Sequence, residues 1–211
     1  MLLKFKEELV VKAITYKECL PFILNIHYAR RTPVIQYAYG LYYKSKLIGV
    51  VTYGQLASPS ACKGVAGDEY KNNVLELNRL VILPEYNGKN FASILVSRSL
   101  KLLPKDYFIV SYADYEGWGH IGYVYQATNW LYTGMTHSRT DKCGDGHPRH
   151  YEADETRRKY RTAKHRYIYI TGNRKKLIKK LKYPIYSKYP KGDSIHYDTN
   201  NPISILEHKE E

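Results

Sequence analysis

Apolar residues between positions 75 and 102 follow two successive periods, which predict a strand and then a helix. From Leu75 to Ile82 they first alternate and then occupy both faces, as in a strand buried on both sides near the middle of a sheet. Pro84 ends this strand, and Gly88 in the following turn can take a positive φ. Apolar residues at helical spacing from Phe91 to Leu102 then predict a helix.

The turn between this strand and this helix is a candidate anion site. A strand, a glycine turn and a helix in this order point free backbone N–H groups at the space above the turn, where an anion such as pyrophosphate can bind. A turn that binds no ligand explains the same residues equally well. The residues predicted to contact a cofactor are Leu83, Gly88, Lys89 and Asn90.

The chain before this core predicts a strand, a capped helix and a hairpin. Residues 3–13 alternate as a first strand, and Thr15 with Glu18 three residues later forms a capping box. Residues 37–54 read as a β-hairpin. Residues 55–74, rich in Ser, Gly, Ala, Lys and Asn, predict a long loop.

The chain after the core predicts a second buried strand over residues 107–114, with Ser111 and Asp114 near its carboxyl end. Ligands and catalytic groups gather at such strand ends in open α/β sheets. A short helix and another strand follow, up to residue 134. We then expect irregular structure over 136–151, a charged helix over 152–164, an edge strand over 166–171, a basic helix over 174–182 and a loose end over 183–211.

Composition indicates a folded protein outside the membrane. The 211 residues allow one domain, or a domain with an appendage, and 44% hydrophobic content supports a core that 23 Tyr make strongly aromatic. No apolar run approaches the ~20 residues of a membrane span, and the N-terminus lacks the apolar run of a signal peptide. Three widely spaced Cys favour free thiols in a reducing cytoplasm.

Positive charge is concentrated in one part of the chain. The net charge is +13, and between residues 155 and 192 the only acid is Glu155. Tyr residues lie between the basic ones, a mixture that suits phosphate contacts and base stacking. A solvated basic face is the alternative, but one-sided clustering favours nucleic acid. The predicted nucleic-acid-binding residues are Arg30, Arg31, Arg157, Arg158, Arg161, Lys164, Arg166, Lys175 and Lys176.

The turn after the central strand resembles that of the GNAT acyltransferases, whose pattern is Gln/Arg-x-x-Gly-x-Gly/Ala. Here the pattern reads Glu85-x-x-Gly88-x-Asn90, which keeps the central glycine and departs from the family at both ends. A wider, ordered set of motifs resembles the Mom family of phage DNA modification proteins over about His27 to Gly134. This set comprises His27-Tyr28-Ala29-Arg30-Arg31-x-Pro33, Glu76-Leu77-Asn78-Arg79-Leu80, Ser111-Tyr112-Ala113-Asp114 and Gly119-His120-x-Gly122-x-x-Tyr125-Gln126-Ala127-Thr128-Asn129-Trp130.

The resemblance implies an α/β, GNAT-like fold with a mixed, mostly antiparallel central sheet flanked by helices and a basic C-terminal extension. It implies an enzyme that converts adenine in duplex DNA to N6-(carbamoylmethyl)adenine, which protects phage DNA from host restriction. The donor and the metal stay open: an acyl-CoA-like donor and an iron ion held by His27 and Asp114 are candidates. A homodimer is a candidate assembly, and the expected location is the bacterial host cytoplasm. The family's site residues fall on His27, Tyr28, Arg79, Ser111, Asp114 and Tyr125.

These residue types suit the chemistry. Adenine N6 is a poor nucleophile because its lone pair is delocalised into the ring, so Asp114 or His27 would remove an N6 proton as bonding begins. Arg79 could bind a donor carboxylate or an oxyanion, and Tyr28, Tyr112 or Tyr125 could sandwich a base that has left the stack. A structural ion pair between Arg79 and Glu76 and a core position for Tyr125 are the alternatives.

Two other functions stay open at this point. The first is a GNAT-like N-acyltransferase that uses acyl-CoA on a protein, an RNA or a small-molecule amine. The second is a nucleic-acid-binding protein on an inactive acyltransferase fold. In each case we expect a catalytic-type domain over residues 1–151 and a basic, Tyr-rich extension over 152–211 that packs on it or is appended to it.

Overall fold

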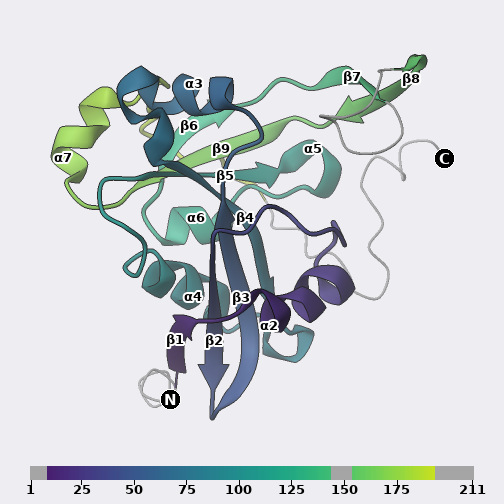
Figure 1. Ribbon diagram of the computed structural model, residues 1–211, viewed down its shortest axis with the longest axis vertical. Coiled ribbons are helices and arrows are strands. Elements are labelled where there is room, and N and C mark those ends of the chain that lie inside the picture. Colours follow the sequence, from purple (N-terminus) through teal and green to yellow (C-terminus); the bar gives the residue numbers. More distant parts are fainter. Residues whose placement is uncertain (1–8, 144–153, 193–211) are drawn as a thin grey trace.

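The computed structural model describes residues 9–143 and 154–192, with the side chains of residues 143 and 154–157 outside the description. Seven strands form one sheet in the order β1-β2-β3-β4-β5-β9-β6 (Figure 1). Only the β4–β5 pair is parallel, so the predicted mixed, mostly antiparallel sheet flanked by helices is confirmed. The strands of this sheet are β1 (Leu9–Ala13), β2 (Tyr37–Tyr43), β3 (Lys46–Gly54), β4 (Val74–Ile82), β5 (Phe108–Asp114), β6 (Leu131–Met135) and β9 (Lys164–Ile170).

Helices cover both faces of this sheet. The largest core cluster packs α4 and part of α6 against one face, and two further clusters pack α2 with the turn η1, and α3 with α7, against the other. The helices are α2 (Tyr16–Pro21), α3 (Pro59–Tyr70), α4 (Phe91–Ser99), α5 (Tyr115–Trp118), α6 (Tyr123–Ala127) and α7 (Arg174–Leu177). Single turns complete the chain at η1 (Phe22–Ile26), η2 (Lys71–Asn73), η3 (Pro84–Tyr86) and η4 (Ile178–Lys180).

The predicted core elements are confirmed. β4 is the fourth of the seven strands, the turn after it contains Gly88 at φ 78°, and α4 follows. The hairpin β2–β3 and the strand β5 lie where expected. Thr15 caps α2 with the predicted capping box, in which Thr15 Oγ1 accepts from the Glu18 N–H at 3.3 Å and the Thr15 N–H donates to Glu18 Oε2 at 2.7 Å.

The predicted loop over residues 55–74 is wrong, because α3 and η2 occupy most of it. Ser58 caps α3 and Pro59 starts it, as these residues commonly do at helix N-termini. Its buried face is made of the small residues Cys62, Val65 and Ala66, which give little amphipathic contrast in the sequence. Gly67, at φ 72° and ψ −178°, interrupts the helical backbone.

Two further predictions, an irregular segment over 136–151 and a helix over 152–164, are wrong where the structure describes them. Residues 139–143 form β7 (Arg139–Cys143) and residues 154–161 form β8 (Asp154–Arg161). The two strands pair antiparallel in a separate two-stranded ribbon that extends from the body (Figure 1). The backbone hydrogen bonds of β8 are made with β7. The charged residues of β8, taken alone, do not indicate this pairing.

The predicted edge strand is an inner strand. β9 pairs with β5 on one side and β6 on the other, because its side chains are apolar on both faces. Tyr167, Ile168 and Ile170 are all buried. A strand from the predicted C-terminal extension is therefore part of the main sheet, and the division of the chain at residue 151 stays a prediction.

The inner position of β9 predicts a large loss of stability when Ile168 is truncated. Ile168 is 0% exposed, and we expect Ile168→Ala to lower the free energy of unfolding by about 2–5 kcal/mol. Ile185→Ala, at a side chain that is 44% exposed, should change it by less than about 0.5 kcal/mol. Urea denaturation followed by circular dichroism measures both variants, and similar small losses would contradict the inner placement.

Candidate active site

A pocket opens where β4 and β5 separate. The two strands are paired only from Val74 to Glu76 on β4 and from Phe108 to Val110 on β5. Beyond these pairs lies a cavity of about 610 Å³, lined by residues of both strands and of the flanking loops. The lining includes His27, Tyr28, Arg31, Glu76, Arg79, Ser111, Tyr112, Asp114, Tyr125 and Lys164.

The structure thus brings all six predicted catalytic residues to one pocket, although their roles stay predictions. They come from three places: the loop after η1, the strand β4, and the segment from β5 to α6. Sequence order alone could not show that these segments meet.

His27 is buried and neutral. The turn η1 is a π-helical turn, which ends with the His27 N–H donating to the Phe22 carbonyl at 3.0 Å. The His27 Nδ1 accepts from the Ala29 N–H at 3.0 Å, so a proton on the neutral ring belongs on Nε2. Burial, followed by the nearby Arg79 charge, lowers the pKa of His27 from 6.5 to about 3.

Aromatic rings line the side of the pocket next to His27. Tyr28 stacks on His27 with the ring centroids 4.3 Å apart and contacts Trp118 at 5.1 Å and His120 at 6.2 Å. Trp118 and His120 were not predicted as site residues. Their place in the turn Gly117-Trp118-Gly119-His120, directly after the strand that carries Asp114, was the signal that could have found them.

Asp114 is buried and held by two partners. Its Oδ1 accepts from the Gly117 N–H at 3.1 Å, which caps α5, and its Oδ2 accepts from Lys164 Nζ. The Asp114–Lys164 pair joins the carboxyl end of β5 to the first residue of β9. Lys164, predicted to bind nucleic acid, therefore lies in the pocket as the counter-charge of Asp114.

Arg79 holds the His27 loop against β4. Its Nε and Nη2 donate to the Arg31 carbonyl at 3.3 and 3.0 Å, and its Nη1 donates to the Asn78 carbonyl. Arg79 forms no ion pair with Glu76 among the described side chains. The alternative expected from the sequence, a structural Arg79–Glu76 pair on β4, is therefore not observed. Burial lowers the pKa of Arg79 from 12.5, in a direction that the neighbouring Glu76 charge opposes.

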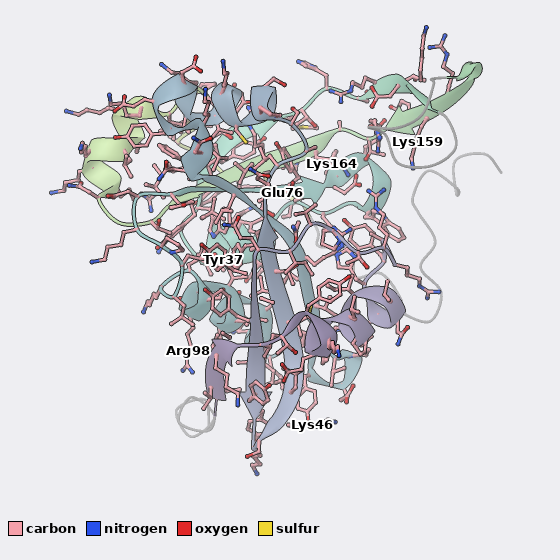
Figure 2. The ribbon with its side chains drawn as sticks, in the orientation of Figure 1. Tyr37, Lys46, Glu76, Arg98, Lys159 and Lys164 are labelled. Atoms are coloured by element: carbon pink, nitrogen blue, oxygen red, sulfur yellow. The ribbon has the colours of Figure 1, made fainter. Side chains whose placement is uncertain are left out.

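Glu76 is a further pocket residue that was not among the predicted site residues. It lies on β4 at the last pair before the strands separate, and it lines the pocket with Lys164 nearby (Figure 2). Its carboxylate accepts no hydrogen bond from any side chain or backbone group that the structure describes. Burial raises the pKa of Glu76 above 4.5, against the opposing charges of Arg79 and Lys164. A carboxylate in this state holds a proton at a higher pH than an exposed glutamate does.

Ser111 and Tyr125 form a buried hydroxyl pair. Ser111 Oγ lies 2.8 Å from the Tyr125 hydroxyl and 3.0 Å from the Leu77 carbonyl, so it connects β5 with β4 and α6. Burial raises the pKa of Tyr125 to about 12, and its ring packs on Trp130 and Tyr167. The sequence left a site role and a core position open for Tyr125. The residue packs against the core and also borders the pocket.

The turn before α4 contributes part of the predicted cofactor set. Gly88 and Asn90 line the pocket, whereas Leu83 packs against the core and Lys89 is exposed. No side chain caps the N-terminus of α4, and a Cβ on Gly88 would meet nothing within 4 Å. Glu85, which departs from the family pattern, turns to Lys46 Nζ at 3.3 Å. The turn can therefore accept an anionic group of a donor.

Apart from Lys164, the predicted nucleic-acid residues separate into four groups. Arg30 and Arg31 are exposed on the His27 loop, and Arg158 and Arg161 are exposed on β8, which also contains the backbone of Arg157. Arg166 donates to the Thr133 hydroxyl and carbonyl at 3.0 and 2.8 Å and stacks on Tyr183, so it has a structural role. Lys175 and Lys176 are exposed on α7.

The residues do not form a complete metal site in the part of the chain that the structure describes. No group of three His, Cys, Asp or Glu could hold a metal ion there. His27 Nδ1 and Asp114 Oδ2 already have partners, so these two residues as arranged do not fit the expected iron, and no reaction step is derived through it. His147 and His150, which with Cys143 have a faint metal-site spacing, lie outside the described residues.

Within the described ranges no helix has the length and hydropathy of a membrane span.

Comparison with known proteins identifies the family. The model of the Mom protein family matches residues 8–191. The chain belongs to the Mom protein family. Membership in the Mom family supports DNA adenine modification by a transferase-like enzyme. No curated protein matches the sequence.

Solved structures that are similar to this chain include several acetyltransferases. An N-acetyltransferase from Staphylococcus aureus Mu50 is 16% identical with a TM-score of 0.46, over 77% of this chain and 98% of that one. A GNAT-family acetyltransferase from Streptococcus pneumoniae is 10% identical with a TM-score of 0.47, over 78% and 100%. A Bacillus subtilis acetyltransferase in complex with CoA is 15% identical with a TM-score of 0.44, over 77% and 98%.

The depressed pKa of His27 predicts an acid-dependent loss of stability. The unfolded chain takes up a proton on this residue below pH 6.5, whereas the folded chain does so only near pH 3. Stability should therefore fall as the pH decreases between these values, by up to about 1.4 kcal/mol per pH unit more in the wild type than in His27→Asn. Urea denaturation at pH 6.5, 5.5 and 4.5 measures the difference, and parallel slopes would contradict it.

Proposed function

We propose that this Mom-family protein converts adenine in duplex DNA to N6-(carbamoylmethyl)adenine and thereby protects phage DNA from host restriction nucleases. The observation that carries the proposal is the convergence of His27, Tyr28, Arg79 and Asp114 on one pocket beside Glu76. The proposed setting is the cytoplasm of a bacterial host, with duplex DNA as the partner and a homodimer as the assembly.

Glu76 is the group best suited to remove the N6 proton. Whatever the donor, a new bond at N6 requires loss of an N6 proton, because the lone pair is delocalised into the ring. Asp114 is already bonded to Lys164 and to the backbone, which occupies both of its carboxylate oxygens. Glu76 has no such partners and a raised pKa, so it can accept a proton and release it again. His27, with its pKa near 3, stays neutral and positions the neighbouring ring.

The aromatic side of the pocket suits the adenine. A base inside the duplex is out of reach, so it must leave the stack at a cost of a few kcal/mol. Tyr28, supported by His27 and Trp118, offers a ring on which an extruded base can lie. Tyr112 also borders the pocket and provides a second ring.

The donor would lie between β4 and the N-terminus of α4. Gly88 and Asn90 border the pocket there with free backbone groups, and an anionic part of an acyl-CoA-like donor fits such groups. Arg79 lies on the same strand and could hold a donor carboxylate or an oxyanion.

The same turn favours a second candidate, an N-acyltransferase that uses acyl-CoA on a protein, an RNA or a small-molecule amine. Isothermal calorimetry with acetyl-CoA separates the two candidates. Tight binding together with DNA that contains only ordinary adenine would favour the second.

Replacement of Glu76 tests the proposed reaction. Nucleoside mass spectrometry of DNA from cells that express the wild-type chain should detect N6-(carbamoylmethyl)adenine, and Glu76→Gln should lower its amount by about 100-fold or more. Glu69→Gln is the matched control, because Glu69 is exposed on α3 and bonded to Lys180 at 2.7 Å. Ordinary adenine alone, in cells with soluble wild-type protein, would overturn the proposed function.

The pH dependence of modification should follow Glu76. The base must be ionised, so the rate should rise with pH through the pKa of Glu76, which lies above 4.5. The rise should be absent from the residual activity of Glu76→Gln. A rate profile of purified protein on duplex DNA provides the measurement, and an unchanged rise in the variant would assign the titration to another group.

A further inference from the structure

The ribbon formed by β7 and β8 is separate from the main sheet. It pairs with no strand of the main sheet and extends from the body beside α5 (Figure 1). Its described side chains are mostly cationic and exposed, and Figure 2 labels one of them, Lys159, on the ribbon. A two-stranded element of this kind buries little apolar area, so burial in the core does not account for it.

Charge on the ribbon is compensated at some positions and uncompensated at others. Asp141 Oδ1 and Oδ2 accept from Arg139 Nε at 2.9 Å and from Arg161 Nε at 3.1 Å. Arg158 and Lys159 are exposed and form no ion pair with any described residue. These two cations therefore remain available to an anionic partner.

The base of the ribbon is fixed to the pocket. The Tyr160 hydroxyl donates to Glu116 Oε1 at 2.5 Å, and Glu116 Oε2 accepts from the Ala163 N–H at 2.6 Å. Glu116 belongs to α5, the helix that Asp114 caps. The residue after Ala163 is Lys164, the counter-charge of Asp114 in the pocket.

We propose that the β7–β8 ribbon is the DNA-contacting arm, which binds the phosphates that flank the adenine in the pocket through Arg158 and Lys159. The inference rests on the proposed function, because it takes duplex DNA as the partner. Cations beside the pocket hold the duplex in register without reading its sequence. The sequence becomes acidic toward the far end of β8, at Asp154 and Glu155, so the contact is confined to the half of the ribbon nearest the body.

The basic helix α7 is the competing surface, and its position disfavours it. α7 follows the end of β9 that pairs with Phe108, whereas the pocket lies at the other end of β5, beside Asp114. Six residue steps along a strand separate these ends by about 20 Å. Figure 1 likewise places α7 and the ribbon on opposite sides of the molecule. A duplex bound at α7 would therefore hold its bases far from Glu76 and Asp114.

Neutral substitutions in the full-length protein test the arm. Arg158→Gln/Lys159→Gln should weaken binding to a duplex of about 20 base pairs at least 10-fold at low salt. It should also reduce the slope of log K against log salt by up to about 1.8, because each phosphate contact contributes about 0.9. Lys101→Gln/Lys105→Gln is the matched control, since both of these side chains are exposed away from the ribbon. It should leave the affinity and the slope unchanged, and fluorescence anisotropy over a salt series measures both quantities.

Lys175→Gln/Lys176→Gln on α7 separates the two surfaces. If this variant loses affinity while the ribbon variant binds as the wild type does, the ribbon is not the arm. Modified adenine from the wild-type chain together with an unaffected ribbon variant overturns the inference but leaves the proposed function intact. A wild-type chain that neither binds duplex DNA nor modifies it overturns both, and thermal unfolding confirms that the variants are folded.

Discussion

The separation of β4 from β5 after three residue pairs is the constraint on which the site depends. Parallel strands that stayed paired would bury Leu77 to Ile82 against Ser111 to Asp114 and leave no room between them. Because they separate, backbone and side-chain groups at the carboxyl ends of two inner strands face a shared cavity. The Ser111 hydroxyl, 3.0 Å from the Leu77 carbonyl, satisfies one of the backbone groups that the separation leaves without a ladder partner.

This separation brings charges into a partly buried space, where each of them needs a partner or a shifted pKa. Asp114 is satisfied by Lys164 and a helix N-terminus, and Arg79 by the carbonyls of the His27 loop. His27 avoids the cost by staying neutral. Glu76 is the exception, because Arg79 and Lys164 are near it but bonded elsewhere. The site therefore contains one carboxylate with hydrogen-bond partners on both oxygens and one whose pKa is raised by burial.

The parts of the fold that follow local periodicity could be predicted, and the parts that depend on distant partners could not. β4, Gly88 and α4 are specified by residues next to one another, and the capping box at Thr15 is specified within four residues. β8 was predicted as a helix because its strand character depends on pairing with β7, across residues 144–153. The motif residues of the pocket were found because the family resemblance fixes their order. Glu76 was missed because the sequence cannot show that the Arg31 carbonyl draws Arg79 away from it.

The charge pattern of the sequence suggested that the basic residues after position 155 form one surface. The fold instead places them at separate locations. Lys164 serves the pocket, Arg166 braces β6 and Tyr183, and α7 lies at the far end of β9. This division follows from β9 itself, since a strand inserted between β5 and β6 carries the residues before and after it to opposite ends of the sheet. The segment before β9 therefore meets the mouth of the pocket, and the segment after it cannot. Proximity to the pocket, more than the number of cations, therefore decides which basic residues can contact a ligand bound there.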